Sequence, residues 1–185
     1  TMAQLMKEGK IRAWGISEAT EDYLRRAHAV CPVAAIQNRY SMMARAHEAL
    51  FPVCEELNVA FVTFSPMANG ILTGAYRPGT QFTDGQDYRA AMPQYTEEGY
   101  TKAQGLLELL TRMAEEKDAT MGQISLAWML CKKPYIVPIP GSRKPERLRE
   151  NFAAGEITLT PEEVTAIDTR LDTMDFAVFG GHSGK

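Results

Sequence analysis

One stretch of the sequence reads IVPIPGSRKPERLREN, from Ile136 to Asn151, and it joins a short apolar run to a helical pattern through a turn. The run from Tyr135 to Pro140 has the length and the β-branched residues of a buried strand. Pro145 is typical of the first position of a helix. The stretch therefore predicts a strand, a short turn and a helix in immediate succession.

The same arrangement recurs along the chain. Three further apolar runs predict strands at Ile11 to Ser17, Val33 to Tyr40 and Val59 to Pro66. Helical patterns cover Thr20 to Val30, Ala46 to Leu57, Thr101 to Lys117, Thr120 to Lys132 and Lys144 to Ala154, and a last helix opens with a capping box at Thr160. Strands that alternate with helices imply an α/β fold with a parallel sheet. Periodicity does not distinguish a barrel wall, with helices on one face, from a doubly wound sheet.

The segment from Met67 to Tyr100 interrupts this alternation. It contains five Gly and two Pro residues among many polar ones. A loop of this length is usually functional or disordered. We assign residues 1–174 to one domain that includes this loop, and residues 175–185 to a C-terminal tail.

Composition excludes several classes of protein. The 185 residues suffice for one domain, and 45% hydrophobic with 23% charged residues is ordinary for a soluble globular protein. A net charge of −3 argues against a nucleic-acid partner. No apolar run reaches the ~18 residues of a membrane span, and Thr1 to Arg12 lacks the apolar region of a signal peptide. We therefore expect a cytoplasmic protein with no membrane partner.

The cysteines and histidines show no metal-binding pattern. The three cysteines lie far apart in apolar surroundings and lack the paired spacing of a zinc site: Cys31, Cys54 and Cys131. They predict buried, free thiols in a reducing compartment. The three histidines are expected to lie at the surface or to be incidental to function: His28, His47 and His182.

The turn after Pro140 concentrates positive charge on Arg143, Lys144 and Arg147, next to Ser142. The N-terminus of a helix offers free N–H groups and the positive end of the helix dipole, so it favours an anion. A guanidinium can hold a phosphate through two parallel hydrogen bonds. The sequence therefore predicts an anion site here, and the alternative is a solvated basic turn that only starts a helix.

The quoted stretch resembles the last strand and following helix of aldo-keto reductases, which hold the adenosine 2′-phosphate of NADPH. By position, the resemblance implies that Ser142 and Arg147 contact the 2′-phosphate and that Glu150 and Asn151 contact the adenine. Gly141 stands where many members of the family have lysine, so a neighbouring basic residue would have to replace that charge.

Two more segments resemble the family in the same order. Gly9 to Ser17 is similar to the fifth strand, whose serine holds the nicotinamide carboxamide. Ala35 to Tyr40 is similar to the sixth strand, whose glutamine binds the same group. Ser17 and Gln37 occupy those positions, and Glu18 follows where asparagine is frequent in the family.

A third segment, FVTFSPM, is similar to the seventh strand of the family, where an aromatic ring stacks on the nicotinamide. The resemblance gives this role to Phe64. It also implies that Ser65, Met67 and Asn69 line the pyrophosphate, and that Gly70 lets the backbone come close.

The resemblance implies a parallel barrel of the TIM type, of which this chain covers about the last four strands and their helices. It implies an NADP cofactor and the reduction of small aldehydes or ketones to alcohols by hydride transfer. In the family a tyrosine donates the proton, tuned by a lysine and an aspartate, and a histidine orients the substrate. All four belong to the first four strands, and no residue of this chain matches them. We therefore predict no catalytic residue here and a chain that is catalytically incompetent alone.

Two alternatives stay open: a truncated, non-catalytic fragment that binds nucleotide or nothing, and a regulatory subunit related to barrels that lost catalysis. A Rossmann dehydrogenase is disfavoured because no G-x-G-x-x-G follows a predicted strand.

Half of a barrel would have two unpaired edge strands, Ile11 to Ser17 and Tyr135 to Pro140. Unpaired edges invite pairing with another chain, so we expect self-association through them. An uncovered inward face would also expose apolar residues, among them Ala13, Ile36, Val62 and Ile139.

Overall fold

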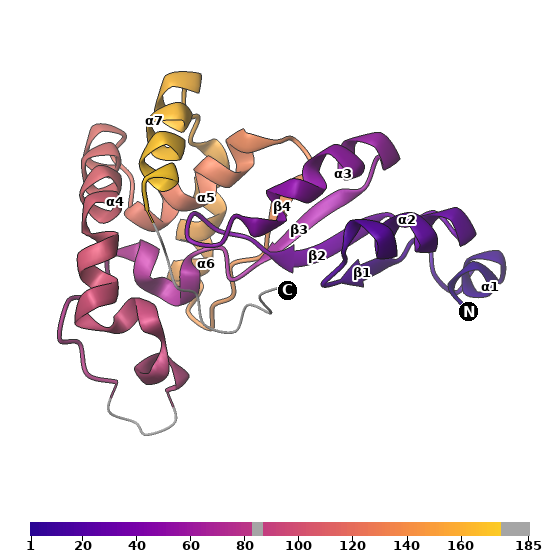
Figure 1. Cartoon of the computed structure of the whole chain (residues 1–185), viewed down its shortest axis with the longest axis horizontal. Helices are drawn as coiled ribbons and strands as arrows, with labels where there is room; N and C mark the ends of the chain where they lie inside the picture. Colours follow the sequence, from indigo (N-terminus) through magenta and orange to yellow (C-terminus); the bar gives the residue numbers. More distant parts are fainter. Residues whose placement is uncertain (83–86, 175–185) are drawn as a thin grey trace.

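The computed structural model describes residues 1–82 and 87–174. Its centre is a four-stranded sheet in the order β1-β2-β3-β4, formed by Gly15–Ser17, Ala35–Arg39, Ala60–Phe64 and Ile136–Pro138. All neighbouring strands pair in parallel, and they lie side by side at the centre of Figure 1. The predicted α/β fold with a parallel sheet is confirmed. Each strand is shorter than its apolar run, and β4 ends near two prolines, which cannot donate to a strand ladder.

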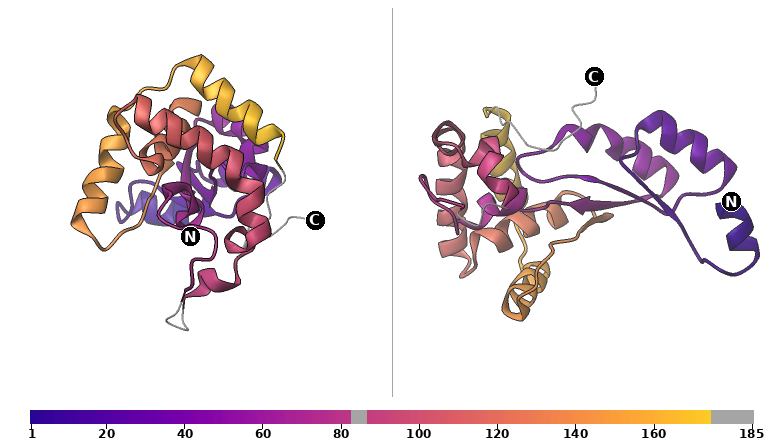
Figure 2. Two further views of the ribbon diagram at one scale, coloured as in Figure 1. Left: turned by 90° about the vertical axis from the view of Figure 1, so that its left-hand side faces the viewer. Right: turned by 90° about the horizontal axis from the view of Figure 1, so that it is seen from below.

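Helices fill the segments between the strands. The α-helices are α1 (Met2–Lys7), α2 (Glu21–Val30), α3 (Phe51–Leu57), α4 (Glu97–Glu116), α5 (Met121–Lys132), α6 (Pro145–Ala153) and α7 (Pro161–Asp172). Short 3-10 helices are η1 (Ala46–Leu50), η2 (Ala68–Thr73), η3 (Tyr88–Ala91), η4 (Pro93–Tyr95) and η5 (Ala154–Glu156). In Figures 1 and 2, α1 and α2 lie at one end of the molecule and α4 and α7 at the other.

Threonine side chains cap several helices. The predicted capping box of α7 is confirmed, because Thr160 and Glu163 each accept a hydrogen bond from the other's backbone N–H. Thr96 accepts from the N–H of Gly99, so α4 begins at Glu97, before the predicted start at Thr101. The segment 67–100 is predicted as one long loop. Outside positions 83–86, which the structure does not describe, it contains three 3-10 helices and the first turn of α4.

The two faces of the sheet differ in burial. One row of side chains is buried against the helices and consists of Ile16, Ile36, Phe61 and Ile136, which pair in register. The next row is exposed or half-buried on the opposite face and consists of Ser17, Gln37, Val62 and Val137. A doubly wound sheet would bury both faces, so this one-sided burial favours the wall of a barrel.

The predicted inward orientation of Ile36 is wrong. Its side chain is 0% exposed and packs on the helix side, whereas Val62 lies in the uncovered row. Successive residues of a strand point to opposite faces, so an error of one position reverses the assignment.

Cys31 and Cys54 are buried free thiols, and burial raises the pKa of Cys54 to about 11. Cys131 is exposed, so the prediction of a buried thiol is wrong there. His28 and His47, predicted at the surface, are half-buried and make hydrogen-bond contacts to Val33 and Asn38. His182 lies outside the described residues.

Residues 1–82 and 87–174 contain neither a membrane-spanning helix nor a metal-binding group of side chains. None of their helices is long and apolar enough to cross a membrane. No three His, Cys, Asp or Glu side chains gather there in a way that could hold a metal ion.

Candidate functional site

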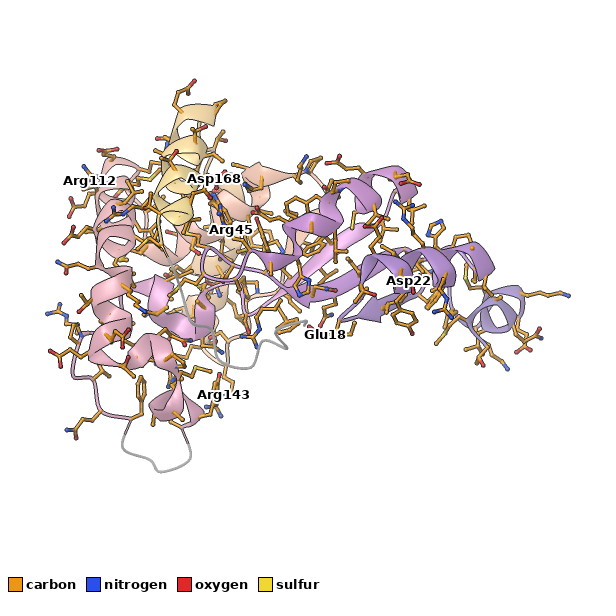
Figure 3. The ribbon with its side chains drawn as sticks, in the orientation of Figure 1. Glu18, Asp22, Arg45, Arg112, Arg143 and Asp168 are labelled. Atoms are coloured by element: carbon orange, nitrogen blue, oxygen red, sulfur yellow. The ribbon has the colours of Figure 1, made fainter. Side chains whose placement is uncertain are left out.

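The residues predicted to form a site fall into two clusters. The strand-end cluster lies at β1 to β3 and in the turn after β3, and it consists of Ser17, Gln37, Phe64, Ser65, Met67 and Asn69. The α6 cluster lies before and on α6, and it consists of Ser142, Arg147, Glu150 and Asn151. In Figure 3, Glu18, which follows Ser17, and Arg143, which follows Ser142, both lie on the lower side of the molecule.

Ser17 and Gln37 are brought together by the register of the sheet. They are paired residues on the neighbouring parallel strands β1 and β2. Both side chains are exposed on the uncovered face. A hydroxyl and a carboxamide therefore stand next to each other, which together offer hydrogen-bond donors and acceptors to one ligand group.

The chain just after Ser17 is fixed by contacts with β2. The backbone N–H of Glu18, at φ 52°, donates to the carbonyl of Gln37 at 2.9 Å. The buried Asn38 holds Ala19 from both sides: its Oδ1 accepts from the Ala19 N–H at 3.1 Å and its Nδ2 donates to the Ala19 carbonyl at 3.0 Å. These bonds leave little freedom to the end of β1. Asn38 has no role in the sequence prediction, because a buried asparagine in a strand has no distinctive spacing.

Phe64 ends β3 and pairs in register with Arg39 on β2. The guanidinium carbon of Arg39 lies 5.3 Å from the centroid of the Phe64 ring. This is a cation–π contact, and it holds the half-buried ring in place on the uncovered face. The sequence prediction did not include Arg39, whose contribution depends on the register.

The turn that follows β3, residues 65–70, has a strained backbone. Ser65, Ala68 and Asn69 have φ values of 53°, 48° and 61°, and Gly70 has 107°. A left-handed backbone costs a residue other than glycine on the order of 1–2 kcal/mol. Strain of this kind persists where the surroundings enforce it, and it concentrates at functional sites.

Asn69 presents an unsatisfied group in this turn. Its Oδ1 atom is buried and has no hydrogen-bond partner among residues 1–82 and 87–174. A buried acceptor without a donor is costly, so each such group in a native structure needs an explanation. A ligand hydroxyl or amide would satisfy it.

Glu150 connects the α6 cluster to the start of α5. Its Oε2 accepts from Arg147 at 2.7 Å, and its Oε1 accepts from the hydroxyl of Thr120 at 2.8 Å. Gln123 donates to its backbone carbonyl at 3.0 Å. The Arg147 side chain is 50% exposed, so its charge remains accessible to an anion that competes with Glu150.

Ser142 and Asn151 lie at the two ends of this cluster. The Ser142 hydroxyl accepts from the N–H of Lys144 at 3.1 Å and so orders the turn before α6. Asn151 borders an apolar groove of about 410 Å³, which Val137, Leu148 and Phe152 also line. Every residue of α6 is at least partly exposed, and the helix projects from the molecule in the right-hand view of Figure 2.

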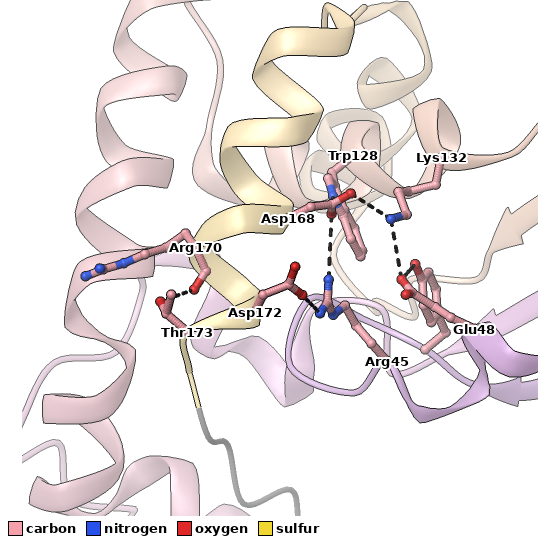
Figure 4. A network of polar contacts seen from close by, with 9 residues as sticks. Arg45, Glu48, Trp128, Lys132, Asp168, Arg170, Asp172 and Thr173 are labelled. Atoms are coloured by element: carbon pink, nitrogen blue, oxygen red, sulfur yellow. Dashed lines mark hydrogen bonds and ion pairs between the residues drawn. The ribbon is translucent and has the colours of Figure 1, made fainter.

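A tyrosine, a lysine and an aspartate also meet, but inside the helical layer. Lys132 binds Asp168 at 2.8 Å and lies 3.6 Å from Glu48 (Figure 4), which accepts the Tyr40 hydroxyl at 2.7 Å. Tyr40 is 0% exposed, and its burial raises the pKa of its hydroxyl. Since this hydroxyl is inaccessible and a poor acid, the network holds the chain after β2 against α5 and α7 and cannot protonate a substrate.

Comparison with known proteins identifies the family. The model of the aldo/keto reductase family matches residues 1–172. The sequence is 40% identical over 170 residues to aldo-keto reductase str7 of Strobilurus tenacellus, covering 90% of this chain and 50% of that protein. It is 35% identical over 178 residues to the Schizosaccharomyces pombe aldo-keto reductase yakc, whose name specifies NADP(+), covering 94% of this chain and 52% of that protein.

The structure agrees with the sequence comparison. It superposes on the glycerol dehydrogenase AKR11B4 from Gluconobacter oxydans with a TM-score of 0.83 and 25% identity, over 94% of this chain and 53% of that chain. The chain spans about half the length of the curated relatives it matches. The resemblance that the sequence motifs indicated is confirmed, and the chain belongs to the aldo/keto reductase family.

Proposed function

We propose that this chain forms the last four strands and their helices of a TIM-type barrel and supplies the cofactor-binding half of an NADP-dependent aldo-keto reductase. The complete enzyme would reduce small aldehydes or ketones to alcohols. The observation that carries the proposal is the placement of Ser17 and Gln37 as paired residues on one uncovered face, with Phe64 on the next strand. The name of the yeast relative, which specifies NADP(+), supports the choice of cofactor.

The residues present fit such a dinucleotide. The hydroxyl of Ser17 and the carboxamide of Gln37 match the donor and acceptor of a nicotinamide carboxamide. Phe64 offers a ring for the nicotinamide to stack on. The orphaned Oδ1 of Asn69 can accept a hydrogen bond from a ribose hydroxyl. Ser65 and Met67 line the same turn.

The α6 cluster would hold the other end of the cofactor. Arg147 carries an accessible positive charge for the 2′-phosphate, and Ser142 lies at the start of the same helix. Glu150 and Asn151 would contact the adenine. Gly141 brings no charge, so discrimination against NAD would rest mainly on Arg147.

NADPH, when bound, supplies the hydride for the reduction. The residues of this chain bind and orient the dinucleotide, and they hold the nicotinamide at the ends of the strands, where barrel active sites lie. We propose that the proton for the alcohol comes from a residue outside the part of the chain that the structure describes; Tyr40 is no candidate there, since it is buried and bound to Glu48. We therefore propose that the chain alone binds cofactor but does not turn over. We also place the protein in the cytoplasm, where its free thiols stay reduced.

The burial of Tyr40 also favours a second candidate, a nucleotide-binding module that takes no part in catalysis. The two candidates share the cofactor site and differ in the complete protein. A full-length protein that binds NADP⁺ but reduces no carbonyl compound would favour the module, and turnover would favour the reductase.

The cofactor site can be tested by calorimetry with Gln37→Leu. The variant should bind NADP⁺ about 3- to 10-fold more weakly, because it loses hydrogen bonds to the carboxamide. Binding of 2′-AMP, which has no nicotinamide, should not change. Gln104→Leu is the matched control, since Gln104 is exposed on α4 and bonds only to Glu108 among the described residues. No binding of NADP⁺ by the unmodified chain, or equal affinities of the two variants, would overturn the proposal.

A further inference from the structure

A cluster of aromatic side chains from residues 76–100 packs beside the strained turn 65–70. The rings of Tyr76, Phe82 and Tyr95 lie 4.9 to 5.5 Å apart between centroids, and Tyr100 lies 6.2 Å from Tyr95. The guanidinium of Arg89 lies over the rings of Tyr76 and Phe82, at 4.7 and 4.9 Å. These contacts make a compact unit from a segment that the sequence predicts as a loop.

Three tyrosines contact the turn directly: Tyr76 and Tyr95 of the aromatic cluster, and the neighbouring Tyr88. The Tyr95 hydroxyl donates to the backbone carbonyl of Asn69 at 2.9 Å. The Asn69 side chain donates through Nδ2 to the Tyr88 hydroxyl at 3.3 Å. Tyr76 lies against Gly70 so closely that a Cβ there would sit 2.8 Å from Cε2 of the ring.

These contacts account for the persistence of the left-handed backbone. Asn69 has a left-handed backbone conformation. Without the hydrogen bond from Tyr95, its carbonyl would be free to rotate with the peptide plane. The Tyr95 bond fixes that plane, while Thr73 fixes the next carbonyl, that of Gly70, at 2.6 Å. Because both carbonyls are held, the backbone of the turn keeps one conformation at Asn69 and Gly70.

We propose that Tyr95 is a positioning residue for the dinucleotide. Its hydroxyl holds the Asn69 carbonyl, so that the turn 65–70 keeps the shape that receives the pyrophosphate and its ribose. The inference rests on the proposed function, in which this turn lines the cofactor. Through the hydrogen bond of Tyr95, the segment after β3 contributes to cofactor affinity.

Tyr95→Phe tests this inference, because phenylalanine keeps the ring packing and removes only the hydroxyl. Calorimetry with the full chain should compare NADP⁺ with 2′-AMP, which carries the 2′-phosphate and the adenine but no pyrophosphate. We expect about 5-fold weaker binding of NADP⁺, the effect of one lost hydrogen bond. Binding of 2′-AMP should stay the same, which a general loss of structure would not allow.

Tyr100→Phe is the matched control. Tyr100 belongs to the same cluster, and among the described residues its hydroxyl makes no hydrogen bond to the turn. Both ligands should bind this variant as they bind the unmodified chain. If the unmodified chain binds no NADP⁺, the proposed function and this inference both fail. If it binds NADP⁺ and Tyr95→Phe matches Tyr100→Phe, or loses both ligands equally, only the role of Tyr95 is overturned.

Discussion

The strand-end cluster and the α6 cluster differ in how firmly the fold holds them. The first follows parallel strands and is tied by the bonds of Glu18 to Gln37 and of Asn38 to Ala19. The second lies on a helix that has no buried residue, with Arg147 50% and Phe152 83% exposed. The strand-end cluster is held in one conformation without a ligand, whereas the α6 cluster presents accessible charge on an exposed helix. We therefore expect substitutions that change the backbone conformation to matter most at the strand-end cluster. Substitutions that change charge should matter most at the α6 cluster.

The largest expected effect is on the rate of carbonyl reduction, because both clusters lack a proton donor. Neither contains a tyrosine or histidine that could protonate a substrate, and the carboxyl group of Glu150 is bound to Arg147 and Thr120. General acid catalysis alone contributes about 10²–10⁴-fold to a rate. We expect the pure chain to reduce no simple aromatic aldehyde at an ordinary enzymatic rate. The assay is the loss of NADPH absorbance, with a mock purification as the control. Turnover that exceeds the mock preparation would show that the chain holds a proton donor.

The uncovered face should dominate the behaviour of the isolated chain. β1 and β4 are edge strands of the sheet, and Val137, Ile139 and Phe152 expose apolar surface near one of these edges. Unpaired edges and exposed apolar surface drive association. We expect dimers or larger species by light scattering. A monodisperse monomer with a sharp, cooperative denaturant transition would contradict the expectation, and with it the assignment of the chain to half of a barrel.

Charge should decide binding at the α6 cluster. Arg147→Ala should weaken NADP⁺ binding by about 1.5 kcal/mol, which is roughly 10-fold. This value is at the lower end of the range for a charged hydrogen bond, because the Arg147 side chain is half-exposed to solvent. NAD⁺ binding should change much less. Arg149→Ala on the same helix is the control and should behave like the unmodified chain. Equal losses for both cofactors would mean that Arg147 supports the structure and binds no phosphate.

Backbone shape should decide stability at the strand-end cluster. Gly70→Ala places a side chain at φ 107° and a Cβ 2.8 Å from the Tyr76 ring. We expect the free energy of unfolding to fall by about 1–2 kcal/mol relative to the unmodified chain, measured by urea denaturation of both at the same protein concentration so that association affects both alike. Gly141→Ala, one residue before the α6 cluster, should be nearly neutral, because a Cβ there meets nothing within 4 Å. Similar losses in the two variants would remove the contrast between the regions.

Sequence motifs placed the strands and most helix starts because those features depend on neighbours in the chain. The capping box at Thr160 is a local pattern, and it forms as predicted. The start of α4 was misplaced because Thr96 caps that helix inside a segment rich in glycine and polar residues. The exposure of Cys131 depends on the orientation of α5 against the sheet. A one-residue offset reversed the predicted orientation of Ile36.

The sequence by itself determined the family, the parallel strands and the residue types at the strand ends, because these follow from motifs and periodicity within short segments. Tertiary structure alone decided which distant groups meet. Asn38 holds Ala19, Arg39 covers Phe64, Glu150 joins Thr120, and Tyr95 holds Asn69. Each contact joins residues that are far apart in the chain or on different strands, and its geometry is set by register and packing, which no local pattern encodes.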